Sequence, residues 1–500
     1  MGVTPDPQED APRIPEIVGE DTLAHEIGRR FSDAGFDAWL VGGSVRDRLL
    51  STGASGPPPD IDIATDAKPS EMVPMLRGWV DQLWFQGVKF GTIGARVGDE
   101  RVEITTYREE WYVEDSRKPE VHFARDIRTD LSRRDFTVNS IAVKIPSGEV
   151  FDPTGGLQDL RKKVLRTPSE PEQAFTDDPL RMLRACRFAA VLDFEVADEV
   201  VDAIVRMKDR LAIVSRERVS DELSKLLVGR KPSKGLDLLV GTGLAEYVIP
   251  ELPALAMEQD PIHRHKDVLR HTFAVVEGMP PTLVGRLAAL MHDIGKPDTR
   301  EFGDEGTVTF HHHEVVGARI TEKRLKELRF PNAVVSDVRQ LVYLHLRFHS
   351  YRLGWTDAAV RRYVRDAGDL LDTLNALVRA DCTTRNKAKA KELRERMDQL
   401  EARIIELTED EELSKIRPPL DGHDVIAFFD LEPSRTVGEA LAFLTELRLE
   451  RGPMGKKEAF AELERWGAGR DLQPVRTPEE ATEIADASRA TADEEDGAGS

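Results

Sequence analysis

The segment PDIDIATD, residues 59–66, decides the fold class of this chain. Its apolar residues alternate with Asp60 and Asp62 as in a β-strand, and this period of two places both carboxylates on one face. Neighbouring carboxylates repel each other unless a cation holds them together. Because Mg²⁺ prefers one or two protein carboxylates together with substrate phosphates, the pair predicts a magnesium site on a strand. A strand end with solvated carboxylates is the alternative.

The segments around this strand predict an α/β domain over residues 21–154. Further apolar runs that are typical of strands occur at residues 38–43, 91–97, 101–107 and 139–145. Gly42 and Gly43 lie at a strand-to-helix turn, where backbone N–H groups can approach a phosphate, and Arg46 follows as a candidate phosphate clamp. Glu103 lies in a strand and is a candidate third carboxylate, with an exposed strand glutamate as the alternative.

Helical patterning follows this domain. Apolar residues three and four apart in LRMLRACRFAAVL, residues 180–192, predict that residues 155–255 form a helical neck. Residues 256–400 are also helical in pattern and concentrate histidine, because nine of the twelve histidines lie between residues 263 and 349. Residues 401–470 have the pattern of amphipathic C-terminal helices.

Six ordered motifs resemble the bacterial CCA-adding tRNA nucleotidyltransferases and their relatives, the bacterial poly(A) polymerases. The motifs are LVGGSVRD (40–47), DIDIATDA (60–67), EITTYR (103–108), RRDFTVN (133–139), DPTGG (152–156) and TDDPLRMLRACRF (176–188). The resemblance covers residues 21–255 and places the chain in the class II branch of the polymerase-β-like nucleotidyltransferases. It implies an α+β fold, in which a nucleotidyltransferase α/β head precedes an all-helical neck, an HD-like body and a tail.

The resemblance also implies site residues. It assigns two Mg²⁺ ions to Asp60 and Asp62, and it makes Glu103 the third catalytic carboxylate. It assigns nucleotide contacts to Gly42, Gly43, Arg46, Arg134, Asp178, Arg181, Arg184 and Arg187. Within this set Asp178 and Arg181 are expected to read the edge of the incoming cytosine or adenine, because a site that hydrogen-bonds a base leaves buried groups unpaired when the wrong base enters. Helical geometry turns Arg187 nearly opposite to Asp178, which weakens its assignment.

The histidine-rich region resembles an HD-type phosphohydrolase domain. Imidazole and carboxylate groups that converge from separate helices suit a divalent transition metal. The resemblance implies His271, His292, Asp293 and Asp381 as ligands of one ion, with His313 and His345 supplying a second. Such a pair of ions polarises a phosphodiester and activates water. A helical domain that is only structural is the alternative.

Composition limits the partners. The net charge of −21 argues against one broad basic surface that grips nucleic acid. Acidic residues without apolar periodicity gather at both ends, so residues 1–20 and 471–500 are expected to be disordered tails. Residues 125–235 hold 21 basic and 19 acidic side chains, which is compatible with a narrow RNA groove.

Two cysteines exclude a disulfide-stapled scaffold, and no apolar run approaches the roughly 20 residues of a membrane span. The acidic, proline-rich start is unlike a signal peptide. We therefore expect a cytoplasmic enzyme that has no membrane partner, and its oligomeric state stays open.

The predicted function is template-independent addition of C, C and A to tRNA 3′ ends, with tRNA, CTP and ATP as partners and Mg²⁺ as cofactor. Within the same class, a poly(A) polymerase or an enzyme that adds only CC or only A is the alternative. From other classes, the alternatives are an HD phosphohydrolase that acts on nucleotides or RNA ends and an RNA-binding chaperone.

Overall fold

The computed structural model describes residues 18–50, 61–111, 120–124, 126–257, 267–302, 308–350, 355–382, 387–411 and 417–497. Asp60 and most of the N-terminal tail expected at residues 1–20 therefore lie outside the described residues. The chain divides into two compact units, Met1–Ala254 with Glu327–Phe330, and Leu255–Lys326 with Pro331–Ser500. None of the described helices is both long enough and apolar enough to cross a membrane.

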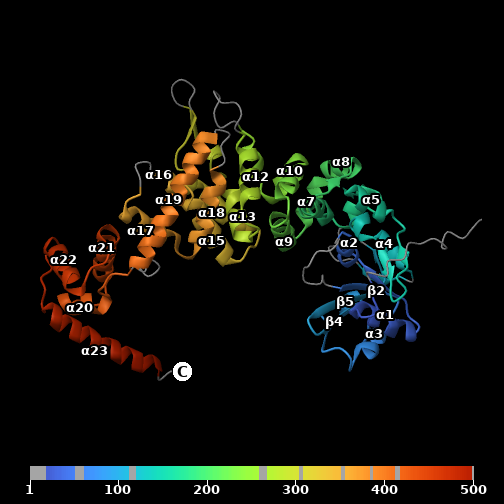
Figure 1. Cartoon of the computed structure of the whole chain (residues 1–500), viewed down its shortest axis with the longest axis horizontal. Coiled ribbons are helices and arrows are strands. Elements are labelled where there is room, and N and C mark those ends of the chain that lie inside the picture. The colour runs from blue at the N-terminus through green and yellow to red at the C-terminus, as the bar shows by residue number, and fades with distance from the viewer. Residues whose placement is uncertain are drawn as a thin grey trace, which may run out of the picture. The chain divides into compact units, whose positions relative to one another are not determined.

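A seven-stranded sheet forms the core of the head, residues 21–154 (Figure 1). In spatial order its strands are β3 (Gln82–Trp84), β4 (Thr92–Val97), β5 (Glu100–Thr106), β2 (Ile61–Thr65), β1 (Ala38–Val41), β8 (Ala142–Lys144) and β9 (Val150–Phe151). All neighbouring strands are antiparallel except β2 and β5, which run parallel. The strands expected at residues 38–43, 91–97, 101–107 and 139–145 are all present, at β1, β4, β5 and β8.

Helices complete the head. They are α1 (Leu23–Asp33), α2 (Gly43–Leu50), α3 (Pro69–Leu76) and α4 (Ile127–Ser132), and the hairpin β6 (Arg108–Trp111) and β7 (Glu120–Phe123) lies outside the main sheet. Helix α1 begins where the Thr22 side chain accepts a hydrogen bond from the His25 N–H, and it buries Ile27 and Phe31. Gly28 allows this helix to pack closely against the backbone of Ile145, because a Cβ at Gly28 would lie 2.6 Å from the carbonyl carbon of Ile145.

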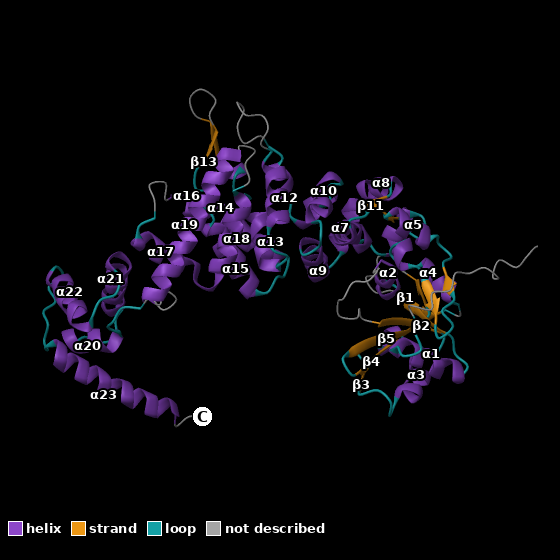
Figure 2. Ribbon diagram, in the orientation of Figure 1, coloured by secondary structure: helices purple, strands orange, loops and turns teal. Residues whose placement is uncertain are grey.

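The neck, residues 155–255, is mainly helical (Figure 2). It comprises α5 (Gly156–Lys162), α6 (Pro171–Asp177), α7 (Leu180–Leu192), α8 (Asp198–Met207), α9 (Arg216–Leu227), α10 (Pro232–Gly241) and α11 (Ala245–Val248). Helix α7 is its centre, packs against both α9 and α10, and is buried on most sides. The expectation of an all-helical neck is wrong in one detail, because β10 (Val164–Leu165) and β11 (Glu195–Val196) pair in parallel. Two-residue strands leave too short an alternation to detect in a sequence.

The second unit begins with the HD-like body, residues 256–400. Its helices are α12 (Val268–Gly278), α13 (Leu283–Met291), α14 (His313–Glu327), α15 (Asn332–Leu344), α16 (Arg347–Ser350), α17 (Asp357–Ala367), α18 (Leu371–Asp381) and α19 (Lys387–Glu411). Helix α13 packs against α12, α15 and α18, and residues 285–291 of it are buried. An antiparallel hairpin of β12 (Arg300–Phe302) and β13 (Val308–Phe310) interrupts the helical pattern.

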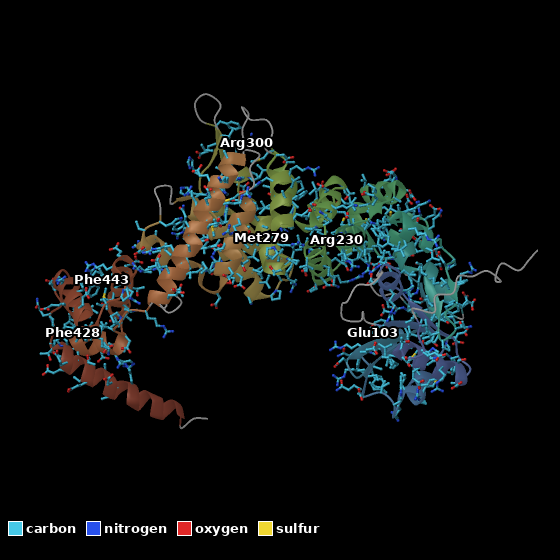
Figure 3. The ribbon with its side chains drawn as sticks, in the orientation of Figure 1. Glu103, Arg230, Met279, Arg300, Phe428 and Phe443 are labelled. Carbon is cyan, nitrogen blue, oxygen red and sulfur yellow. The ribbon has the colours of Figure 1, made fainter. Side chains whose placement is uncertain are left out.

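The chain ends in four helices, α20 (Gly422–Phe429), α21 (Arg435–Arg451), α22 (Lys456–Ala468) and α23 (Pro478–Gly497). Phe428 and Phe460 are buried in their common core, and Phe443 packs against it (Figure 3). The expectation of a disordered tail is wrong for residues 478–497, which form α23. Ala481 and Ala485 are buried on one side of α23, which packs against α20. The acidic composition of this segment gave no sign of that contact. The predicted mixed α/β head followed by helices is otherwise confirmed.

Candidate active site

Asp62 and Glu103 are direct neighbours in the sheet. The parallel register of β2 and β5 pairs Asp62 with Glu103, so both side chains project from the same face about one strand spacing, 4.8 Å, apart. The structure thus brings together two of the three predicted carboxylates, whereas Asp60 lies outside the described residues. Two carboxylates side by side on a strand face form a donor set that suits a hard divalent cation.

Gly42 extends this face onto the end of β1. Its φ of +70° lies in the left-handed region that favours glycine. A Cβ at this position would lie 3.0 Å from Nη1 of Arg134 and 3.5 Å from Oδ2 of Asp62. The backbone, a guanidinium and a carboxylate therefore converge here, and only a residue without a side chain leaves room between them. Gly43, the next residue, begins α2.

Buried acceptors orient the two arginines that are predicted to meet the triphosphate. Arg46 on α2 is 8% exposed and donates from Nη1 to Oδ1 of Asn139 at 2.6 Å. Arg134 donates from Nη2 to Oδ2 of Asp130 at 3.0 Å. Burial alone would raise the pKa of Asp130, but the guanidinium groups of Arg134 and Arg133 outweigh it and lower that pKa to about 2. Asp130 thus holds Arg134 in place, and it is a site residue that the sequence motifs did not indicate.

Arg184 joins the neck to the head. Its Nε donates to Oδ2 of Asp135 at 2.9 Å, and Asp135 also accepts a 2.9 Å hydrogen bond from Nδ2 of Asn139. On its other side Arg184 donates from Nη1 to the buried Glu222 at 3.3 Å, and Glu222 lies 2.6 Å from Nε of Arg187. Arg184 and Arg187 therefore both contact protein carboxylates, and they share Glu222 as a partner.

Asp178 and Arg181, the predicted base-reading pair, lie just before α7 and in its first turn, and each contacts a different partner. Oδ2 of Asp178 accepts from Nη2 of Arg218 at 2.8 Å. Nη2 of Arg181 donates to the carbonyl oxygen of Arg133 in the head. Nη1 of Arg181 is buried and has no hydrogen-bond partner among the described residues, so it remains a donor for a ligand.

A second cluster brings together all six predicted ligands of the HD-like body. Nε2 of His271 lies 2.9 Å from Oδ1 of Asp381. Nε2 of His292 lies 3.2 Å from Oδ2 of Asp293 and 3.7 Å from Oδ1 of Asp381. The cluster is completed by His313, whose Nε2 lies 3.4 Å from Oδ1 of Asp293, and by His345, whose ring centre lies 5.3 Å from that of His313.

The backbone orients three of these histidines in the same way. His292, His313 and His345 each place Nδ1 within 2.6–2.8 Å of the carbonyl oxygen three residues earlier, which sets the tautomer with hydrogen on Nδ1. Their Nε2 lone pairs then face inward, and none of these buried atoms has a hydrogen-bond partner among the described residues. Inward-facing imidazole lone pairs beside Asp293 form a set that fits a divalent transition metal.

The charges of this cluster are strongly perturbed. Burial and the neighbouring His292 lower the pKa of His345 to about 3, so its ring is neutral. Burial opposes ionisation of Asp293, yet His292 and Lys296 hold its pKa well below the usual value. A neutral His345 and an ionised Asp293 are in the protonation states that bind metal. Burial lowers the pKa of His292, but the carboxylates of Asp293 and Asp381 outweigh it and raise that pKa, so metal binding must displace a proton from this ring.

Two further members of the cluster lie outside the predicted ligand set. Nζ of Lys296, a buried residue, donates to Oδ2 of Asp293 at 2.7 Å. Nε2 of His349 lies 3.6 Å from Oδ2 of Asp381. Each stands three or four residues beyond a predicted ligand, a spacing that could have revealed both.

Three known families match consecutive parts of the chain. The family described as "Poly A polymerase head domain" matches residues 38–166, and the family described as "Probable RNA and SrmB- binding site of polymerase A" matches residues 193–255. The "HD domain" family matches residues 282–410.

Individual relatives extend the comparison. A CCA-adding enzyme of Pediococcus pentosaceus is 40% identical over 225 residues, which are 45% of this chain and 54% of that enzyme, so the match spans about half the length of this relative. A CC-adding tRNA nucleotidyltransferase of Thermus thermophilus is 34% identical over 455 residues, 89% of this chain and 96% of that enzyme. The crystal structure of the Bacillus stearothermophilus CCA-adding enzyme with CTP is similar with a TM-score of 0.63 and 26% identity, over 90% of this chain and 98% of that one.

Proposed function

We propose a function from the premise that this chain belongs to the family of the bacterial CCA-adding enzymes and related tRNA nucleotidyltransferases. We propose that it adds C, C and A to the 3′ ends of tRNA, with CTP and ATP as substrates. The single observation that carries the proposal is the register of Asp62 with Glu103 beside Gly42 and Arg134. This arrangement brings together two carboxylates, the backbone of Gly42, which a phosphate can approach closely, and the guanidinium of Arg134.

In the proposed reaction, the 3′-hydroxyl oxygen of the RNA attacks the α-phosphorus of the nucleoside triphosphate. A phosphodiester bond forms, and the bond from the α-phosphorus to the bridging oxygen of pyrophosphate breaks. Divalent cations bound by Asp62, together with Asp60, would supply the charge neutralisation that the attacking oxygen and the pyrophosphate need, and we propose Mg²⁺ as the ion. We assign to Glu103, which pairs with Asp62 on the neighbouring strand, the role of accepting the hydroxyl proton. Arg46 and Arg134 would hold the triphosphate.

Base selection is assigned to the start of α7. The buried Nη1 of Arg181 has no hydrogen-bond partner among the described residues, and a base edge would supply the acceptor that it lacks. Asp178 offers acceptors to the exocyclic amino group that cytosine and adenine share. Uracil and guanine present a carbonyl oxygen at that position, and so would leave these groups mismatched.

An enzyme that adds only CC is the second candidate. The specific observation in its favour is the match to the Thermus thermophilus CC-adding enzyme over 96% of that protein. Incubation of the full chain with Mg²⁺ and labelled CTP or ATP separates the candidates, with tRNA transcripts that end before CCA or after CC as primers. We expect two C and then one A. Incorporation that stops after CC supports the second candidate, long A tails indicate a poly(A) polymerase, and no incorporation contradicts all three.

We also propose that the HD-like body binds a divalent transition metal and hydrolyses phosphoesters at RNA ends. The three inward-facing Nε2 atoms of His292, His313 and His345 support this proposal. Hydrolysis of a 2′,3′-cyclic phosphate or 3′-phosphate on a short RNA by the full chain, with loss of activity after chelation and recovery with added metal, is the expected result. Hydrolysis that is indifferent to chelation contradicts it.

A further inference from the structure

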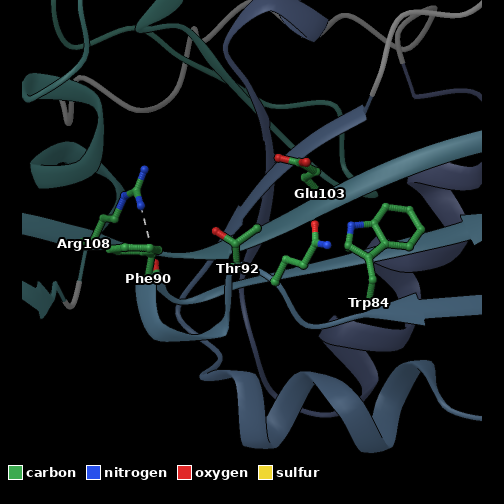
Figure 4. Close-up of a pocket in the computed structure, with 8 residues that line it drawn as sticks. Trp84, Phe90, Thr92, Glu103 and Arg108 are labelled. Carbon is green, nitrogen blue, oxygen red and sulfur yellow. Dashed lines mark hydrogen bonds between the residues drawn. The ribbon is translucent and has the colours of Figure 1, made fainter. Parts of the chain in front are cut away.

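A hollow lined by aromatic side chains borders the catalytic carboxylates. It measures about 250 Å³ and is lined by residues that include Trp84, Phe90, Thr92, Glu103 and Arg108. Figure 4 shows Glu103 and Trp84 at one end of the hollow, with Phe90 and Arg108 at the other. The volume lies below the roughly 300–1,000 Å³ of pockets for drug-sized ligands, so it suits a fragment such as one nucleoside.

The sheet register places this hollow on the catalytic face. Gly94 on β4 pairs with Glu103 on β5, and Glu103 pairs with Asp62 on β2, so all three positions project from the same face. A Cβ at Gly94 would overlap Nε1 of Trp84 at 1.9 Å, so the indole covers the bare backbone of Gly94. The indole and the two carboxylates therefore follow one another across three adjacent strands, and the indole lies about 10 Å from the strand of Asp62.

The order of the strands in the sheet places the groups proposed for the triphosphate and the hollow on opposite sides of Asp62. On one side of Asp62 lie Gly42 and Arg134, the groups proposed for the triphosphate. On the other side lie Glu103 and the hollow. In a phosphoryl transfer the attacking oxygen and the leaving group lie roughly in line, on opposite sides of the phosphorus. The group that carries the attacking hydroxyl therefore approaches from the side of Glu103.

We infer that the hollow binds the 3′-terminal nucleoside of the RNA primer, with its base stacked on Trp84 and Phe90. This inference rests on the proposed nucleotidyl transfer, and it specifies where the RNA primer, the second substrate, contacts the head. Aromatic side chains bind single-stranded bases of any sequence, because every base has a π-face. Phe90 is 51% exposed and so accessible to a base, and the guanidinium of Arg108 is fixed at the rim by a 3.4 Å hydrogen bond to the Phe90 carbonyl oxygen. A cation at that rim can meet a phosphate of the primer.

A mutant cycle between the protein and the primer tests this inference. The full chain carries Trp84→Ala or Trp84→Phe, and the primer is a tRNA transcript whose 3′-terminal nucleotide is either intact or abasic. We expect Trp84→Ala to weaken binding of the intact primer by about 5- to 150-fold, the range that base stacking on an aromatic ring contributes. With the abasic primer the same substitution should change binding by less than about two-fold, because no base remains to stack. Trp84→Phe should retain most of the affinity.

A matched control and a second readout keep the outcome specific. Trp79, whose ring lies 4.3 Å from the guanidinium carbon of Arg30 outside the hollow, serves as the control through Trp79→Ala. Trp84→Ala should leave the KM for CTP unchanged, and melting curves identify a variant that fails to fold. Equal losses with intact and abasic primers, or a rise in the KM for CTP alone, would overturn the inference while transfer itself persists. A wild-type chain that incorporates no nucleotide overturns the proposed function and the inference together.

Discussion

Arg184 of the neck donates from both Nε and Nη2 to Oδ2 of Asp135 in the head, with the Nε hydrogen bond at 2.9 Å. The two residues are 49 positions apart in the chain. Asp135 also accepts from Asn139, which in turn accepts from Arg46. The arginine proposed to hold phosphate and the helix proposed to read the base are thus tied together by three consecutive hydrogen-bonded contacts.

Replacing Asp135 by Asn should uncouple these parts. The substitution removes the negative charge opposite Arg184 but keeps a similar shape, so we expect a loss of about 1.5–3 kcal/mol in the free energy of unfolding, the contribution of hydrogen bonds to charged groups. The KM for CTP should rise as well, because Asn139 and Arg46 lose their fixed partner. Denaturant unfolding and steady-state kinetics measure the two effects. Unchanged stability and KM would show that the contact is not maintained in solution.

The free energy of unfolding of the head should also depend on pH in the acidic range. Burial alone would raise the pKa values of Asp130 and Asp135, but both are lowered to about 2 from the ordinary 3.8, because Arg134 and Arg133 face Asp130, and Arg184 and Asn139 face Asp135. A carboxylate with a lowered pKa in the folded state stabilises the protein above its unfolded pKa, and this contribution is lost as the pH falls through the folded value. We therefore expect unfolding free energy to decrease from about pH 5 to pH 2. Asp130→Asn and Asp135→Asn should each flatten this decrease, and an unaltered slope in both variants would contradict the assignment.

Gly42→Ala should abolish transfer through a local clash. Alanine at a left-handed φ costs about 1–2 kcal/mol, and its Cβ would also lie 3.0 Å from Nη1 of Arg134. Gly98 provides a matched control, because its φ is +58° and nothing lies within 4 Å of a Cβ there. We expect similar losses of stability in the two variants but loss of nucleotide incorporation only in Gly42→Ala. Equal activity in both would mean that the space at Gly42 is not used.

Some features of the site could be predicted from local sequence patterns, whereas others depend on packing between distant segments. Alternation along each strand was sufficient to predict that Asp62 and Glu103 lie in strands, because the period of two is local, but their pairing depends on the register of β2 with β5. The pairing of Asp135 with Arg184 could not be predicted, because it depends on how α7 packs against the head. The stacking of Trp84 on Gly94 depends in the same way on the register of β3 with β4. The helix α23 could not be predicted from its acidic composition. Its alanines Ala481 and Ala485 are buried because α23 packs against α20, and this contact joins segments that are distant in the sequence.

Asp62→Asn should separate the two proposed activities. The change keeps the shape of the side chain and removes one charge from the cation site, so we expect nucleotide incorporation to fall by about a hundred- to a thousand-fold, the order seen when transition-state charge loses its stabilisation. Hydrolysis of phosphoesters should be unaffected, since the HD-like cluster uses other residues. Glu100→Gln, on the same strand as Glu103, is the control for charge loss on the sheet. If Asp62→Asn abolished hydrolysis too, the assignment of two independent sites would be wrong.

Metal content tests the histidine cluster directly. His292→Ala removes an inward-facing Nε2 from between Asp293 and Asp381, so we expect the purified full chain to lose most of its bound transition metal. Loss of a residue that only hydrogen-bonds a ligand commonly costs about 10- to 100-fold in metal affinity, and loss of a direct ligand should cost at least as much, which dialysis against a weak chelator makes visible. His312 lies next to His313 in sequence, but its side chain is 82% exposed, and His312→Ala should therefore keep the wild-type metal content. Elemental analysis of the three proteins measures this. Equal metal in wild type and His292→Ala would contradict the ligand assignment, whereas equal loss in both variants would indicate that the metal binds at the exposed histidines instead.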